Sequence, residues 1–324
     1  VEAKKPSVDM KNDPEPYYQL RRYGFSAKLP LSIVTDFEEL AIVDCRVKPS
    51  PKDKASTGRI RYWRYDEYLE HFEEIYNTFS KEAILTGSFD RSVAVAKTKR
   101  GTGEVDKEFL KEIESWRELL ARNIALRNPG LTQRELNTAV QLTIDRIIFL
   151  RICEDRGIED YGLLQGTQNG ANVYARLCEQ FQRADERYNS GLFHFSEERG
   201  NPSHSDEMTL GLTIDDKLLK QLLKGLYYPD SPYEFSVLPA DILGQVYEQF
   251  LGKVIRLTAG HRAVIEDKPE VKKAGGVYYT HPYSSDWARG GEGGGGCSLR
   301  PAGALVGGQA GRFRRWPDCC QAPR

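Results

Sequence analysis

The sequence lacks the features that define several common protein classes. No run approaches the roughly 20 apolar residues of a membrane-spanning helix, and no basic and apolar signal peptide opens the chain. The six cysteines form no CxxC pair and the five histidines have no metal-ligand spacing, which excludes a zinc ribbon and a dithiol redox motif. The formal net charge of −1 excludes a basic field over the whole surface, but not a local basic patch. These absences favour a reduced, cytoplasmic globular protein.

The composition changes after Thr280. Residues 281–324 hold ten of the 29 glycines and three of the six cysteines, but no lysine or isoleucine. Their six arginines and three acids give a charge of +3, which leaves −4 on residues 1–280. We interpret this tail as disordered and as the product of a reading-frame shift near Thr280, with a natural low-complexity tail as the alternative. Because the chain opens on Val1, we expect both ends to be cut from a longer protein.

The N-terminal third has the pattern of an α/β sheet. A short helix is expected over Tyr17–Tyr23, with Gly24 as its C-terminal stop. Two strands are expected to follow it, over Leu31–Thr35 and Leu40–Cys45. A strand is also expected before the helix, at the start of the chain. Parallel strands need a crossover connection, so a strand, a helix and a further strand in this order predict an α/β arrangement.

A basic loop is expected over Arg46–Arg64, followed by an acidic helix over Asp66–Ser80 and a second basic loop over Lys97–Gly103. Cationic side chains of the first loop could contact DNA phosphates, and Trp63 could stack on or wedge between bases. A mobile, solvated lysine loop is an equal alternative. The candidate phosphate contacts are Lys48, Lys52, Lys54, Arg59, Arg61 and Arg64.

From residue 106 onward the pattern becomes helical. Thr132 and Glu135 have the spacing of a capping box, which begins a long apolar helix that ends before Gly157. Charged residues interrupt this helix, and Arg151 and Asp155 are spaced to pair within it. We interpret these charges as a structural ion network rather than a DNA contact. The expected helices are Asp106–Arg127, Thr132–Arg156, Ala171–Tyr188, Asp215–Tyr227 and Leu238–Leu257.

The first candidate site is the tripeptide Glu2-Ala3-Lys4. In a strand, residues two apart project from the same face, so Glu2 and Lys4 would stand side by side. A carboxylate can hold a hard divalent cation, and a neighbouring ammonium can position or polarise an attacking water. The alternative is a surface ion pair on an edge strand. Further along, Gln19 and Tyr23 are four residues apart and share one face of the expected helix.

An E-x-K strand followed by Q-x-x-x-Y on a helix resembles the PD-(D/E)xK nuclease fold of the QxxxY kind. The run Gln19–Gly24 and the strands around it are similar to the N-terminal nuclease domains of type IIG fused restriction–modification enzymes. Two later segments, Asp145–Gly157 and Ile242–Gly252, resemble the first and last helices of the helical connector in that family. Gly276–Thr280 looks like the entry to its methyltransferase domain.

The resemblance implies an α/β to all-α organisation: a truncated PD-(D/E)xK-like mixed sheet over residues 1–104 and a helical connector domain over 105–270. The methyltransferase domain would start at 271–280, and the disordered tail would occupy 281–324. The fold's upstream acidic residue would lie before Val1. No glycine-rich S-adenosylmethionine loop and no Asn-Pro-Pro-aromatic motif occur in the sequence, so no cofactor-binding residues are assigned.

Two functions are therefore expected as alternatives. In the first, the chain is a fragment of an enzyme that cleaves double-stranded DNA with Mg²⁺ and methylates adenine with S-adenosylmethionine. The resemblance implies Glu2, Lys4, Gln19 and Tyr23 as catalytic residues, with Glu2 as the metal ligand. In the second, the chain is a DNA-binding or scaffold fragment without turnover.

Overall fold

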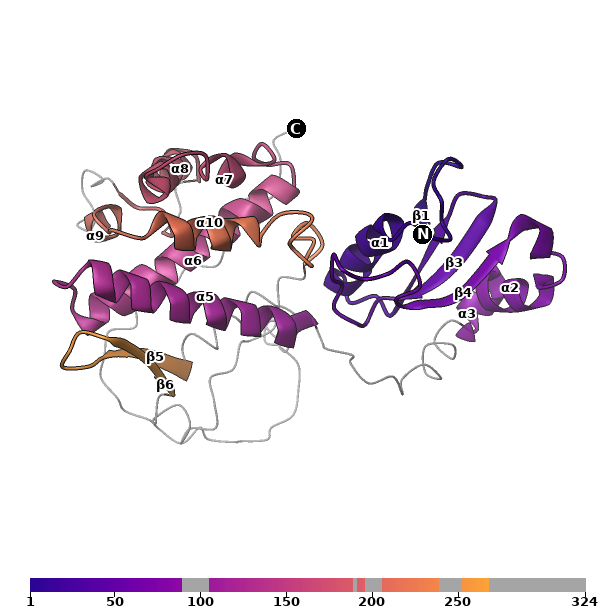
Figure 1. Cartoon of the computed structure of the whole chain (residues 1–324), viewed down its shortest axis with the longest axis horizontal. Coiled ribbons are helices and arrows are strands. Elements are labelled where there is room, and N and C mark those ends of the chain that lie inside the picture. The colour runs from indigo at the N-terminus through magenta and orange to yellow at the C-terminus, as the bar shows by residue number, and fades with distance from the viewer. Residues whose placement is uncertain (89–104, 189–190, 196–205, 239–251, 268–324) are drawn as a thin grey trace, which may run out of the picture.

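The computed structural model describes residues 1–88, 105–188, 191–195, 206–238 and 252–267. An α/β part and a helical part lie side by side (Figure 1). The sheet of the α/β part has the order β1-β2-β3-β4, in which β1 pairs parallel with β2 and the other pairs are antiparallel. The elements of this sheet and its crossover helix are β1 Glu2–Ala3, α1 Glu15–Ser26, β2 Leu31–Thr35, β3 Glu39–Asp44 and β4 Arg59–Arg64.

Both faces of this mixed sheet are covered. Because side chains alternate along a strand, Ala41 and Val43 of β3 face α1, while Ile42 faces the opposite side. On the first face, Tyr17 and Leu20 of α1 pack in the same apolar cluster as the two β3 residues. On the second face, the cluster includes Ile75 and Phe79 of helix α2, which spans Phe72–Phe79. The expected strand–helix–strand crossover is confirmed.

The bounds of α1 correct the role expected of Gly24. The helix continues past this residue to Ser26, so Gly24 is not its stop. A Cβ atom on Gly24 would lie 2.4 Å from Cys45 Sγ, which directly follows β3. Glycine is therefore required for the close approach of helix and sheet, and not for a left-handed cap.

Two further expectations for the α/β part were too coarse. The segment Arg46–Arg64 is not a loop throughout, because Arg59–Arg64 forms the edge strand β4. The acidic helix expected over Asp66–Ser80 is broken into a 3₁₀ turn, Tyr65–Glu67, and α2, with helix α3 following over Lys81–Leu85. The basic segment Lys97–Gly103 lies outside the described residues.

The helical part is built around two long helices that pack together, α5 and α6. Thr132 Oγ1 accepts from the Glu135 N–H and Glu135 accepts from the Thr132 N–H, which confirms the capping box. Gly157 adopts a φ of 69° after α6 and so ends it. The helices are α5 Val105–Arg127, α6 Gln133–Asp155, α7 Leu163–Gly166, α8 Val173–Tyr188, α9 Glu207–Leu210 and α10 Asp216–Lys224.

The expectation of an all-α second part was wrong at its end. The helix expected over Leu238–Leu257 is wrong over its last five residues, because Lys253–Leu257 forms strand β5, which pairs antiparallel with β6, Ala263–Asp267. Ile255 is buried in the helical core, and its N–H and carbonyl both bond to the side chain of Asn137 on α6. Tertiary contacts thus favour a β-hairpin here. Residues 239–251 and everything after 267, including the expected methyltransferase entry and tail, lie outside the described residues.

Among the helices that the structure describes, none combines the length and the apolar character needed to cross a membrane.

Candidate active site

Glu2, Lys4 and Gln19 come together at the edge of the sheet. Lys4 Nζ donates to Glu2 Oε1 at 3.1 Å and to Gln19 Oε1 at 2.7 Å. The strand places the first two residues side by side, and the crossover helix α1 returns over the same face to bring the third. Three of the four expected catalytic residues are therefore in direct contact.

Tyr23, the fourth expected residue, lies one turn beyond Gln19 on α1 and is 40% exposed. The negative charge of Glu234 raises the pKa of Tyr23, and partial burial and the charge of Glu2 raise it further. Tyr23 thus lies in the electrostatic field of both Glu2 and Glu234. Its phenol stays protonated near neutral pH and can donate a hydrogen bond.

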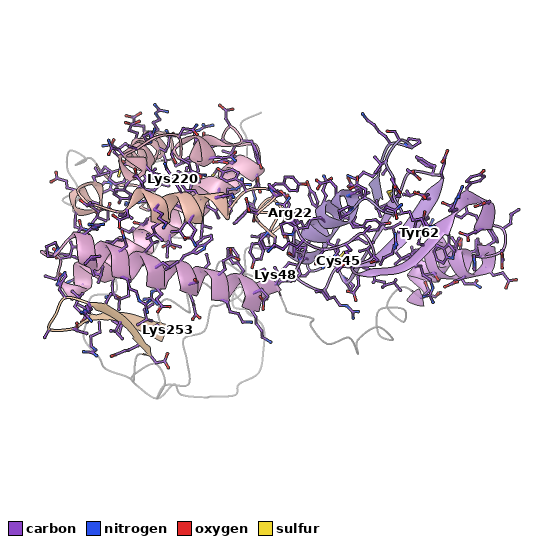
Figure 2. The ribbon with its side chains drawn as sticks, viewed as in Figure 1. Arg22, Cys45, Lys48, Tyr62, Lys220 and Lys253 are labelled. Carbon is purple, nitrogen blue, oxygen red and sulfur yellow. The ribbon has the colours of Figure 1, made fainter. Side chains whose placement is uncertain are left out.

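The two arginines between Gln19 and Tyr23 were not expected to have roles, yet both are buried, which is rare for charged residues without partners. Arg21 donates to Asp53 Oδ2 at 2.6 Å and to the Val47 carbonyl, so it holds the basic loop against α1. Arg22 points toward the helical part (Figure 2), where it donates to the carbonyls of Ser231 and Tyr233. One short helix therefore connects the site, the basic loop and the helical part.

The basic side chains expected to contact phosphates do not form one free surface. Lys48 Nζ lies 3.9 Å from Glu108 Oε2 and 3.5 Å from Glu112 Oε2. Both glutamates are on α5, so Lys48 bridges the α/β part and the helical part. Arg61 pairs with Glu74, and Arg64 lies 3.7 Å from Asp66. Arg59 donates to the Lys11 carbonyl and to the Tyr17 hydroxyl.

Lys52 and Lys54 keep their side chains exposed, and among the described residues no carboxylate pairs with either. Trp63 is different, because it is 4% exposed and packs with Leu31 and Ile42 under α2. The expected stacking of Trp63 on bases is therefore wrong: its side chain fills the core on the second face of the sheet. The free cations of this region are at the tip of the loop rather than on β4.

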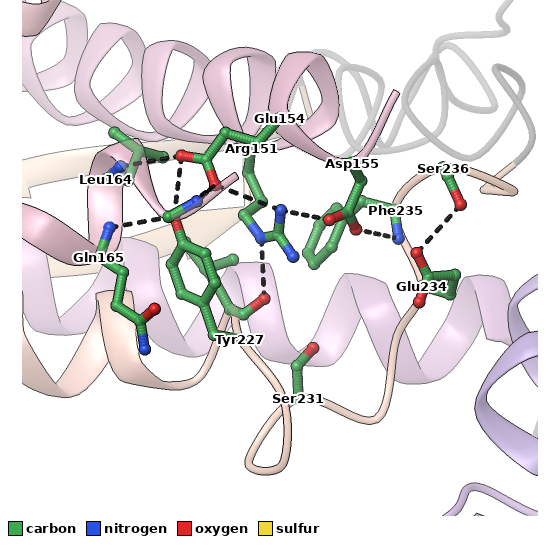
Figure 3. A network of polar contacts seen from close by, with 12 residues as sticks. Arg151, Glu154, Asp155, Leu164, Gln165, Tyr227, Ser231, Glu234, Phe235 and Ser236 are labelled. Carbon is green, nitrogen blue, oxygen red and sulfur yellow. Dashed lines mark hydrogen bonds and ion pairs between the residues drawn. The ribbon is translucent and has the colours of Figure 1, made fainter. Parts of the chain in front are cut away.

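The charges on α6 form the expected structural network, shown in Figure 3. Arg151 Nη1 lies 2.5 Å from Asp155 Oδ1 and 3.4 Å from Glu154 Oε2, and Arg151 Nε donates to the Leu226 carbonyl. Glu154 accepts from the Tyr227 hydroxyl and from two backbone N–H groups. These groups are buried, so they are unavailable to DNA.

With this geometry established, comparison with known proteins gives one informative match. Over 270 residues, 83% of the chain, the sequence is 37% identical to the type II restriction enzyme and methyltransferase RM.Eco57I of Escherichia coli. The chain is similar to part of a restriction–modification protein. It spans about a quarter of that relative's length, since the match covers 26% of it. No protein-family model matches the chain, and no solved structure matches it.

The donor set at the site suits a hard cation that keeps other ligands. Mg²⁺ is commonly held by one or two carboxylates together with waters and substrate phosphates. Glu2 offers one such carboxylate, with its side chain one-third exposed. In the described parts of the chain, no cluster of three or more His, Cys, Asp or Glu residues could hold a metal. A metal at Glu2 would therefore need oxygen ligands from a further acid, water or substrate.

Proposed function

We propose that this chain carries the nuclease portion of a restriction–modification enzyme, with Glu2, Lys4, Gln19 and Tyr23 around the scissile phosphate of double-stranded DNA. The observation that carries the proposal is the position of Lys4 Nζ between Glu2 Oε1 and Gln19 Oε1. This spatial trio is built by a parallel crossover, which is the arrangement expected of a PD-(D/E)xK nuclease of the QxxxY kind. The similarity to RM.Eco57I supports the same assignment.

Each residue has a chemical task in this proposal. Glu2 would hold Mg²⁺, which supplies Lewis-acid polarisation of the phosphate and lowers the pKa of a bound water. Lys4 directs its remaining N–H bond at the attacking water or at the negative charge that develops on the phosphate. Gln19 fixes the ammonium by accepting one of its hydrogen bonds, and Tyr23 can donate to a phosphate oxygen at the rim. A second carboxylate, outside the acidic residues assigned here, would complete the metal site.

The longer protein would also methylate adenine in DNA with S-adenosylmethionine, in a domain beyond the described residues. This part of the proposal rests on the sequence resemblance and on the similarity to RM.Eco57I, a restriction enzyme and methyltransferase.

Cleavage of supercoiled plasmid by the full 324-residue chain in Mg²⁺ tests the nuclease assignment. We expect Glu2→Gln and Lys4→Ala each to abolish nicking, while Lys11→Ala, which removes an exposed lysine nearby, leaves it unchanged. Retention of full activity in both Glu2→Gln and Lys4→Ala would refute the assigned site.

The second candidate function is DNA binding without turnover. The presence of only one assigned carboxylate at the site favours it. Gel-shift measurements on the folded chain distinguish the two candidates: binding that responds to Lys52→Ala, with no nicking in Mg²⁺ or Mn²⁺, supports the non-catalytic function.

A further inference from the structure

One face of α1 is bonded to a loop of the helical part. The Tyr18 hydroxyl donates to the carbonyls of Pro229 and Ser231, at 2.5 and 3.1 Å. Arg22 donates from Nε to the Ser231 carbonyl at 2.8 Å and from Nη2 to the Tyr233 carbonyl at 2.6 Å. A single guanidinium therefore spans two carbonyls of the loop that follows α10.

The same stripe of α1 continues for another turn. Ser26 Oγ accepts from the Glu234 N–H at 2.8 Å, four residues after Arg22. Phe25 is buried in the core of the helical part, with its ring centroid 6.3 Å from that of Tyr233. Arg22 itself is 5% exposed, so its hydrogen bonds to the loop are buried. This contact is part of the packed interior.

The loop is also bonded to α6, on its other side. The Phe235 N–H donates to Asp155 Oδ2 at 3.0 Å, and Asp155 pairs with Arg151. Arg151 in turn donates to the Leu226 carbonyl at the start of the loop (Figure 3). The loop is thus held between α6 and α1, and any displacement of it relative to α6 would be passed to α1.

The residues of the proposed nuclease site alternate with those of this contact. Gln19 follows Tyr18 directly, and Tyr23 follows Arg22 directly, on a helix of 12 residues. A helix of this length moves nearly as a rigid body, so a shift of the bonded stripe displaces Gln19 relative to Lys4. The Lys4–Gln19 bond joins the residue that follows β1 to α1, so it would lengthen or break on that displacement.

We propose that Arg22 is a positioning residue for the nuclease site, through which the helical part sets the place of Gln19 and Tyr23. Its effect on cleavage rests on the proposed function, whereas its effect on Gln19 geometry does not. The planar guanidinium can donate to carbonyls of two different residues at once. A lysine at this position would keep the positive charge but not this fixed geometry of donors. The helical part therefore fixes the position of α1, which carries Gln19 and Tyr23.

The test uses the full chain and the ¹H–¹⁵N signal of the Gln19 side-chain amide, identified by its loss in Gln19→Ala. We expect Arg22→Ala to move or broaden this signal and Arg22→Lys to restore it in part. Arg187→Ala is the matched control, because Arg187 also donates to a backbone carbonyl, that of Ile158, and in addition pairs with Glu159. Arg187→Ala should leave the Gln19 side-chain signal unchanged. An unchanged Gln19 signal in folded Arg22→Ala overturns the proposal.

If Arg22→Ala does not fold, Tyr18→Phe replaces it, because that variant removes a single hydroxyl from the same contact, and the same criterion applies. Where the wild-type chain nicks plasmid, we expect Arg22→Ala to lower kcat about tenfold and to change KM for DNA less than twofold. An equal kcat with a displaced Gln19 signal overturns the positioning role. Absence of nicking by the wild type counts against the proposed function, and the Gln19 signal then decides the positioning role.

Discussion

Gln19 accepts a hydrogen bond of 2.7 Å from the Lys4 ammonium, although Lys4 directly follows β1 and Gln19 lies on α1, 15 positions later. The bond leaves the ammonium oriented by two oxygens, one from Gln19 and one from Glu2. Lysine has a long, flexible side chain, and fixing it costs conformational entropy. The backbone of Gln19 is already ordered in a helix, so the acceptor adds little to that cost.

Replacing Gln19 should therefore weaken catalysis without removing it. We expect Gln19→Ala to lower kcat for nicking about tenfold, because Lys4 keeps its charge but loses its orientation. Initial rates on supercoiled plasmid measure the effect. Gln141→Ala, which removes a glutamine that bonds Asp145 on α6, is the control and should retain full activity. Equal rates for both variants would contradict the role of Gln19.

The exposed lysines at the tip of the basic loop should contribute to DNA affinity through phosphate contacts. Each of Lys52→Ala and Lys54→Ala is expected to reduce the slope of log K against log salt by about 0.9, since each removes one phosphate contact. Fluorescence anisotropy with a labelled duplex at several salt concentrations measures the slope. Lys220→Ala removes a lysine that bonds the Gly170 carbonyl in the helical part and should leave the slope unchanged. Identical slopes in all four proteins would exclude this surface.

Arg151 should be essential for stability. Its side chain is 1% exposed and pairs with Asp155 and Glu154, which would be left as buried carboxylates without a cationic partner in this network. We expect Arg151→Met to lower the free energy of unfolding by about 3–5 kcal/mol. Arg187→Ala breaks an exposed pair with Glu159 and should cost less than about 1 kcal/mol. Urea unfolding monitored by circular dichroism compares them, and similar costs would show that burial of the pair has no effect.

Gly24 should tolerate no side chain. The added Cβ of Gly24→Ala would lie 2.4 Å from Cys45 Sγ and 2.6 Å from Cys45 Cβ, so α1 must move away from the sheet. We expect a loss of about 1–3 kcal/mol in unfolding free energy. Gly166→Ala, at the end of α7, meets nothing within 4 Å and should be nearly neutral. A stabilised Gly24→Ala protein would mean that helix propensity outweighs the overlap.

Glu234 should make stability depend on pH. Burial raises its pKa above the ordinary 4.5, the negative charge of Asp155 raises it further, and Arg22 opposes both. The folded state therefore binds this proton more tightly than the unfolded state. The resulting stabilisation is complete below pH 4.5 and is lost as the pH rises through the folded pKa. Glu234→Gln removes this loss, so its unfolding free energy should decline less over that interval. Superimposable pH profiles for the two proteins would contradict the assignment.

Much of the local structure could be predicted because its determinants are close in sequence. The capping box at Thr132, the long helix after it and the Arg151–Asp155 pair all depend on residues within four positions of one another. The meeting of Glu2 with Lys4 depends on strand alternation alone. The contact of Lys4 with Gln19 required the further step of a crossover helix, which the order of strand, helix and strand predicted.

The secondary-structure predictions were wrong where contacts between residues distant in sequence decide the conformation. Arg59–Arg64 carries three cations in the run expected as a loop, yet it pairs with β3 because Trp63 packs in an apolar cluster under α2. Lys253–Leu257 becomes a strand because Asn137, more than a hundred residues earlier, bonds the backbone of Ile255. Local propensity is a weak guide where such contacts are available.

The sequence by itself determined the crossover, the long helices and the pairing of Glu2 with Lys4, since each depends on spacing within one or two elements. Only the tertiary structure decided what the arginines of α1 do. Arg21 bonds a carbonyl of the basic loop that lies 26 positions later in the sequence. Arg22 bonds carbonyls of the helical part that lie about 210 positions later. Backbone carbonyls are present at every residue and leave no mark in a sequence, so only the folded chain reveals which of them a buried guanidinium meets.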